Sequence, residues 1–118
     1  MKMNAALAAL AALAQESRLS IFRHLVEAGP EGSIVGPIAD ALDLPPATLS
    51  FHLKELAQAG LISRQQEGRF IRYVANFDTM NALIGYLTEN CCGGKPELCG
   101  PACAPSPHRK TTRPRTPA

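Results

Sequence analysis

The sequence predicts a mainly α-helical domain with one small β-hairpin. Three observations lead to this fold class. Alanine and leucine are abundant, tryptophan is absent and aromatic residues make up 5% of the chain, which favours helices with an aliphatic core. Apolar residues recur at helical spacing over most of the first 90 residues. Between residues 61 and 76, two short β-rich runs around Glu67-Gly68 interrupt that spacing and indicate a hairpin.

Chain length and charge limit what such a domain can do. At 118 residues the chain can bury only a modest core, so association with another subunit is expected. The net charge of +2 is unevenly spread. The last eleven residues hold four basic and no acidic side chains, which leaves eight basic against ten acidic residues in the first 107. A nucleic-acid surface on the folded part must therefore be a local patch.

The N-terminal segment MKMNAALAALAALAQE has two interpretations. Its apolar run and Ala-Leu-Ala end match a secretory signal peptide. However, the helical pattern continues past Gln15 into Leu19, Phe22 and Leu25, which favours a helix of the folded domain. No stretch is long and apolar enough to span a membrane. We therefore expect the protein in the cytoplasm, where thiols remain reduced.

Proline and glycine mark the ends of the predicted helices. Gly29-Pro30 ends the second helix, and Pro45-Pro46 stops the third because the residue before a proline is disfavoured in helical geometry. The segment EGSIVGP is predicted to be a linker. The predicted helices are 3–14, 16–28, a short helix opened by Pro37, a helix from Pro46 to Gly60 and, after the hairpin, 78–90 with Asp78 or Thr79 as its N-cap.

The last part of the chain differs in composition from the rest. After Ala104 proline, threonine and arginine dominate, and such a segment cannot bury enough apolar area to fold. We predict a folded domain over residues 1–90, a cysteine-rich segment over 91–104 and a disordered basic tail over 105–118.

The two central helices have the pattern of a helix-turn-helix. A short helix and a tight break precede a second helix whose leucines recur at i, i+4 and i+7. The second helix of this motif enters the major groove of DNA. Residues 44–75 hold four basic and two acidic residues, which gives the required local patch. The predicted DNA contacts are Thr48, Ser50, Phe51, His52 and Lys54 on the outward positions of this helix and Arg64, Arg69 and Arg72 on the hairpin. A helical hairpin of no particular function is the alternative.

Two strings resemble a known family. TLSFHLKELAQAGLI followed by RQQEGRFIRYV is similar to the recognition helix and wing of the ArsR/SmtB family of metal-responsive repressors. The resemblance covers roughly residues 5–90. It implies a winged helix-turn-helix of order α-α-α-α-β-β-α, a homodimer that binds an inverted repeat in operator DNA and no enzymatic activity. It also implies that the first and last helices form the dimer seam, where we expect Leu7, Leu10, Met80, Leu83 and Leu87.

All four cysteines lie between residues 91 and 103. The resemblance implies two other possible metal sites, a cysteine pair on the helix before the recognition helix and a zinc site with histidines on the last helix. Neither can exist here, because GSIVGPIADAL has no cysteine and DTMNALIGYLTENCC has no histidine. The cluster resembles the C-terminal site of arsenite-responsive members. Soft, thiophilic ions select thiolates, so the expected inducer is As(III) or Sb(III), with no organic cofactor. We expect the ligands Cys91, Cys92 and Cys99, with Cys103 as a spare donor or a bystander. Gly93-Gly94 lets the backbone turn both adjacent thiols inward.

Other interpretations of the cluster remain open. Cys99 and Cys103 have the spacing of a zinc knuckle, nearby thiols can form a redox-sensitive disulfide, and Cd(II) or Pb(II) are also thiophilic. A small thiol reductase or metallochaperone would need a reactive thiol beside a base, typically in Cys-x-x-Cys at a helix start. Here the cysteines follow a helix and no base is paired with them, which favours the repressor.

Overall fold

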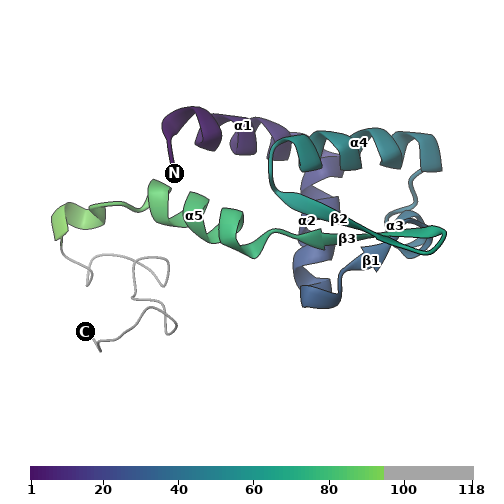
Figure 1. Ribbon diagram of the computed structural model, residues 1–118. Helices are drawn as coiled ribbons and strands as arrows, with labels where there is room; N and C mark the ends of the chain where they lie inside the picture. The colour runs from purple at the N-terminus through teal and green to yellow at the C-terminus, as the bar shows by residue number, and fades with distance from the viewer. Residues whose placement is uncertain (95–118) are drawn as a thin grey trace. The chain divides into compact units, whose positions relative to one another are not determined.

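The computed structural model describes residues 1–94, the side chain of Cys92 excepted, and confirms a mainly helical fold with a small sheet (Figure 1). The chain divides into two compact units, Met1–Leu83 and a second that begins at Ile84. The elements are, in order, α1 (Met3–Leu13), α2 (Glu16–Ala28), the 3-10 turn η1 (Gly29–Glu31), β1 (Ser33–Ile34), α3 (Val35–Leu42), α4 (Pro46–Gln58), β2 (Ile62–Glu67), β3 (Phe70–Ala75), α5 (Phe77–Leu87) and the 3-10 turn η2 (Cys91–Gly94).

Helix α1 packs inward through alanines rather than leucines. Ala6, Ala9 and Ala12 recur every three residues and are buried, while Leu7 and Leu10 on the other side are exposed. The alanine side contacts α2 and α4, and small side chains allow helix axes to approach closely. Three larger apolar side chains of α1, Met3, Leu7 and Leu10, are therefore left on the outside of the single chain.

The break between α1 and α2 is held by hydrogen bonds on both sides. The Gln15 side chain accepts a bond from the backbone N–H of Arg18 at 2.8 Å, which caps α2. The Arg18 Nε–H donates back to the carbonyl oxygen of Ala12 at 2.6 Å. Within the described residues no single helix is long and apolar enough to cross a membrane, although α1 and Glu16–Glu31, bent by 102° at this break, pass the same test as a pair.

The sheet has three antiparallel strands in the order β1-β3-β2. The prediction of a linker between α2 and α3 is wrong in part, because Ser33 and Ile34 pair with Tyr73 and Arg72 as strand β1. Gly32 permits this close approach: its φ is +60°, and an added Cβ would collide with the carbonyl oxygen of Tyr73. A two-residue strand has too little periodicity for the sequence to reveal it.

The core of the first unit consists of aliphatic side chains, as the composition predicted. Burial of each such side chain stabilises the fold by about 1.5–3 kcal/mol relative to its exposure. All but one of its largest fully buried side chains come from α2, α3 and α4, and α4 also contacts β2. Its largest fully buried members are Ile21, Leu25, Ile38, Leu49, Leu53, Leu56 and Leu61. This packing fixes α4 against the hairpin.

Helix α5 begins and ends earlier than the sequence suggested. Asn76 is its N-cap, because the Asn76 Oδ1 accepts a hydrogen bond from the backbone N–H of Thr79 at 3.2 Å; Asp78 or Thr79 had been expected. The helix ends at Leu87, where residue 90 had been expected. Asn90 then adopts a left-handed conformation with φ of +55° before η2 begins. The cysteine pair therefore follows a turn of the backbone and does not continue helix α5.

Candidate nucleic-acid interface

A tight turn joins α3 to α4. Helix α3 ends at Leu42, and Asp43 takes the left-handed conformation with φ of +54° while its N–H bonds to the carbonyl of Ala39. Pro45 is extended, and Pro46 occupies the first turn of α4, where a missing N–H has no cost. Helix α3 starts at Val35, before the predicted Pro37. These residues make the predicted helix-turn-helix.

Helix α4 has a buried and an exposed side. The buried side chains are Leu49, His52, Leu53 and Leu56. Four of the five residues predicted to contact DNA from this helix are exposed, namely Thr48, Ser50, Phe51 and Lys54. The exposed side thus combines two hydroxyls, an aromatic ring and an ammonium group, which are groups able to contact base edges and phosphates.

His52 does not face outward, and the prediction of a DNA contact there is wrong in its premise. The side chain is 8% exposed. Its Nδ1 lies 3.5 Å from the Nη1 of Arg18, and its ring meets the ring of Phe51 edge-on with centroids 5.5 Å apart. An arginine can only donate, so a hydrogen bond between these two groups has the His52 Nδ1 as its acceptor. His52 therefore supports α4 from inside the domain.

Sequence reasoning missed the residue that holds His52. Arg18 lies in a polar stretch at the start of α2 and gives no pattern that separates it from a solvent-exposed arginine. In the folded chain its guanidinium joins the end of α1, at the Ala12 carbonyl, to the middle of α4 at His52. Only the packing of three helices brings these groups together.

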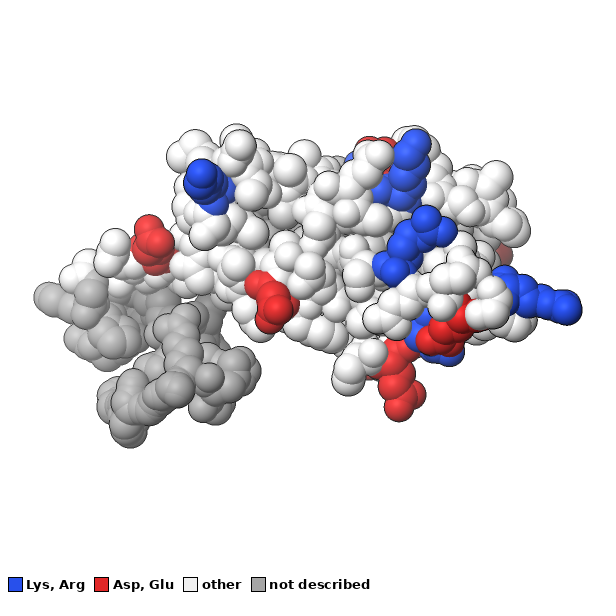
Figure 2. All heavy atoms as spheres, in the orientation of Figure 1, with Lys and Arg blue, Asp and Glu red and all other residues white. Residues whose placement is uncertain are grey.

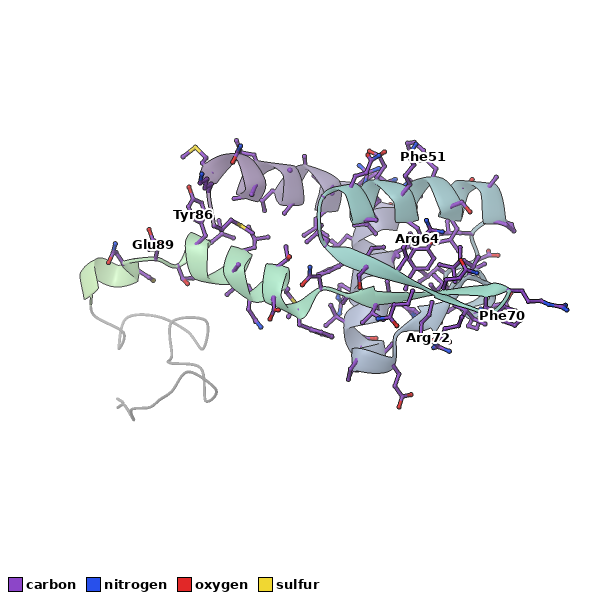
Figure 3. All side chains as sticks on the ribbon, viewed as in Figure 1. Phe51, Arg64, Phe70, Arg72, Tyr86 and Glu89 are labelled. Atoms are coloured by element: carbon purple, nitrogen blue, oxygen red, sulfur yellow. The ribbon has the colours of Figure 1, made fainter. Side chains whose placement is uncertain are left out.

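The two strands of the hairpin place their arginines on opposite faces. Cross-strand partners in an antiparallel pair share a face, and neighbours along a strand alternate between faces. Arg64 is paired with the buried Tyr73, whereas Arg72 precedes Tyr73 in β3 and is paired with Gln65. Figure 3 shows Arg64 on the side of the hairpin toward α4 and Arg72 away from it. The predicted arginine cluster is therefore divided.

A groove of about 290 Å³ lies between α4 and the hairpin. Its polar lining combines Ser50 and Lys54 of α4 with Arg64 of β2, so two cations and a hydroxyl face one hollow. The full lining is Ser50, Leu53, Lys54, Ala57, Gln58, Arg64 and Tyr73. In Figure 2 most of the basic side chains of this face lie over α4 and the hairpin, and acidic side chains lie beside those of the hairpin. With α4 in the major groove of a duplex, the cations and the hydroxyl of this protein groove are suited to contact the phosphate backbone.

The other two hairpin arginines differ from Arg64 and from each other. The Arg72 Nε–H bonds to both carboxylate oxygens of Glu67 at 3.0 Å, and its Nη1 donates to the carbonyl of Glu31 at 3.0 Å. Arg72 is thus engaged in holding the hairpin to η1. Arg69 is exposed at the hairpin tip beside Gly68, which has φ of +62°, as the sequence predicted.

Comparison with known proteins places this architecture in a family. Residues 13–65 match a family of helix-turn-helix domains. The chain is 32% identical over 81 residues to the arsenical resistance operon repressor of Bacillus subtilis, which covers 69% of this chain and 73% of that protein. An ArsR-like transcriptional regulator from Rhodococcus sp. RHA1 is 25% identical, with a TM-score of 0.66 over 80% of this chain and 87% of that one. The chain belongs to the ArsR family.

A second solved structure agrees on the fold. The homodimeric winged helix-turn-helix DNA-binding domain Mb0332 of Mycobacterium bovis, a possible ArsR-family regulator, has a TM-score of 0.61 at 24% identity, over 79% of this chain and 86% of that one. The ArsR-family chain is therefore a winged helix-turn-helix, with α4 as the recognition helix and β2 and β3 as the wing. Its family is one of DNA-binding transcriptional regulators, which are not enzymes.

The cysteines of this ArsR-family chain lie at the limit of the described residues. Cys91 is half-buried in η2, and its backbone N–H bonds to the carbonyl of Thr88 at 3.0 Å. The predicted ligands Cys99 and Cys103 lie outside residues 1–94, and only the backbone of Cys92 is described. Among the described side chains no group of three or more histidines, cysteines or carboxylates is placed to hold a metal ion. The cysteine site stays a prediction.

The five residues expected at the dimer seam of this ArsR-family chain differ in their exposure. Leu7, Leu10 and Leu87 are 58%, 39% and 59% exposed in the single chain, and Met80 is half-buried. Leu83 is 7% exposed, so its side chain is already covered within one subunit. Exposed leucines at these positions are available for contact with another subunit.

Proposed function

We propose that this protein is a repressor that binds operator DNA as a homodimer and leaves it when As(III) or Sb(III) binds its cysteine thiolates. The groove in which Ser50 and Lys54 of the recognition helix meet Arg64 of the wing carries the DNA-binding half of the proposal. The relative named as an arsenical resistance operon repressor supports the inducer and the control of arsenic resistance genes. We further propose that it acts in the cytoplasm.

On DNA, the exposed side of α4 lies in the major groove. Thr48 and Ser50 offer hydroxyls to base edges or phosphates. Lys54 and Arg64, from the two sides of the protein groove between α4 and the hairpin, bind the phosphate backbone of the DNA. Arg69 at the wing tip reaches the neighbouring DNA backbone. Because each bound phosphate releases counterions, removal of any of these cations makes binding less dependent on salt.

A homodimer places two recognition helices on an inverted repeat. Half-sites for such dimers lie about 34–36 Å apart, which is one turn of the duplex. In this proposal a second copy covers the exposed Leu7 and Leu10 of the first unit and the exposed Leu87 of the second unit. The homodimeric state named for Mb0332 supports it.

The inducer site uses the soft donors of the chain. Cys91, Cys92 and Cys99 supply three thiolates to a trivalent ion that favours sulfur. The left-handed Asn90 and Gly93, with φ of +55° and +61°, flank the pair with sharp turns, and this fits a segment in which adjacent cysteines must turn toward one centre. Cys103 is a spare donor.

Release of DNA requires that the ion prefer the conformation that does not fit the operator. The ion weakens DNA binding by the same free energy by which DNA weakens ion binding. The cysteine pair follows α5 by three residues, so pulling both thiols toward an ion acts on the end of a helix that carries the exposed Leu87. A shift at the dimer seam changes the half-site spacing and weakens binding to both halves of the operator.

The decisive experiment is a DNA-binding titration with reduced full-length protein and the DNA upstream of its own coding sequence. Cys91→Ser and Cys92→Ser should bind this DNA like the unmodified protein and should not be released by arsenite. Cys103→Ser is the matched control and should keep the response. Serine variants with unchanged arsenite sensitivity would reject the thiolate site, and release by peroxide alone, reversed by a reductant, would favour a redox sensor. Release by zinc, cadmium or lead in place of arsenite would change the inducer.

A further inference from the structure

One large apolar side chain stands on the exposed side of the recognition helix. Phe51 is 56% exposed (Figure 3). It belongs to a stripe at i, i+4, i+7 and i+11 that runs opposite the buried leucines and consists of Ala47, Phe51, Lys54 and Gln58. Water disfavours an exposed phenyl ring, so this ring gains free energy from any apolar group that covers it.

The ring of Phe51 packs against the ring of a buried residue. His52 packs edge-on against it, with centroids 5.5 Å apart and planes at 61°. His52 is itself buried and lies against Arg18, which is bonded to the Ala12 carbonyl. A contact made by Phe51 therefore loses little side-chain entropy on binding, because the ring is already oriented.

The surroundings of the ring favour a nucleic acid over a protein as its partner. Phe51 has hydroxyls and an ammonium group around it, from Thr48, Ser50 and Lys54, rather than other large apolar side chains. A protein interface of useful size would need an apolar core. The partner should instead be polar and anionic and should present one small apolar group to the ring.

We propose that Phe51 reads a thymine through its C5-methyl group, which rests on the proposed binding of duplex DNA by α4. In the major groove the thymine methyl is the only apolar group that a base pair presents. A phenyl ring cannot exchange hydrogen bonds with the other base edges, so it favours thymine at one position of each half-site and disfavours cytosine, whose amino group would lose its partner there. Phe51 is thus a specificity-determining residue of the repressor.

The test uses the highest-affinity duplex selected by the reduced full-length protein from a random DNA library. Each thymine in turn is replaced by deoxyuridine, which keeps the base pair and removes only the methyl group. For the unmodified protein, each half-site should contain one position where removal of the thymine methyl alone weakens binding by about fourfold. This is the effect of one methyl in an apolar contact. Phe51→Ala should bind more weakly overall and should show no loss at that same position.

Phe70→Ala is the matched control, because Phe70 is equally exposed, at 57%, but lies on the wing. This variant should keep the sensitivity to deoxyuridine. Thermal unfolding of Phe51→Ala should stay close to that of the unmodified protein, because the ring is 56% exposed and the change removes only its edge-on contact with His52. The inference is overturned if no thymine methyl matters, or if Phe51→Ala is as sensitive as the unmodified protein at the same position. Selection of no DNA at all would instead overturn the proposed function on which the inference rests.

Discussion

Two pairs of basic residues in the first unit have the same charge and opposite roles. Lys54 and Arg64 line an open groove and make no ion pair among the described residues. Arg18 and Arg72, in contrast, are bound to other groups of the same chain. Arg18 contacts His52 and the Ala12 carbonyl, and Arg72 contacts Glu67 and the Glu31 carbonyl. A cation in a DNA-binding motif is therefore available to DNA only if it is not already held by hydrogen bonds or ion pairs within the fold.

The first prediction concerns Lys54 and Arg64, the two cations of the groove, whose removal should have the greatest effect. Replacing Lys54 and Arg64 together by glutamine removes two phosphate-binding cations from each subunit of a dimer, so operator affinity should fall by about a hundredfold at ~0.1 M salt. The slope of log affinity against log salt should decrease by about one for each phosphate that is no longer bound. Fluorescence anisotropy at several salt concentrations measures both quantities.

The free energy of unfolding provides the control for this double variant. Both side chains are at the surface of the groove, so urea unfolding should be unchanged within ~0.5 kcal/mol. An unchanged salt slope would show that the groove does not receive phosphates, whatever the decrease in affinity.

The second prediction tests the engaged pair at Arg18. Replacing Arg18 by leucine removes hydrogen bonds from a charged donor and leaves the Ala12 carbonyl and the His52 Nδ1 without it. The free energy of unfolding should fall by about 2 kcal/mol, measured by urea denaturation followed by circular dichroism. Arg18→Lys, which keeps the charge but can reach one acceptor at a time, should be destabilised less. Equal stability of Arg18→Leu and the unmodified protein would mean that these hydrogen bonds are not formed in solution.

The smallest effect is expected at Arg72. Its partner Glu67 is half-exposed, and such pairs contribute about 0.2–1 kcal/mol. Arg72→Gln should therefore lower the unfolding free energy by no more than that amount and change operator affinity by less than about twofold, because the side chain lies on the face away from the groove. The comparison is with Arg64→Gln in the same anisotropy assay. If affinity fell equally in the two variants, the division of the hairpin into two faces would be wrong.

The order of the elements and the type of domain could be predicted from local features of the sequence. Leucines spaced for a buried stripe, with prolines and glycines at the breaks, located four helices, a hairpin and a last helix within a few residues of their observed bounds. The exposed side of α4 was also predicted, except at His52. These features are local, because helix periodicity and chain breaks depend on residues a few positions apart.

Tertiary structure decided which predicted side chains reach the same place. His52 has a helical position near the edge of the buried side, so its exposure depends on whether α1 and Arg18 cover it. Strand β1 exists only because Gly32 lets it approach Tyr73. Each of these outcomes depends on contacts between residues distant in the chain, which local spacing does not encode.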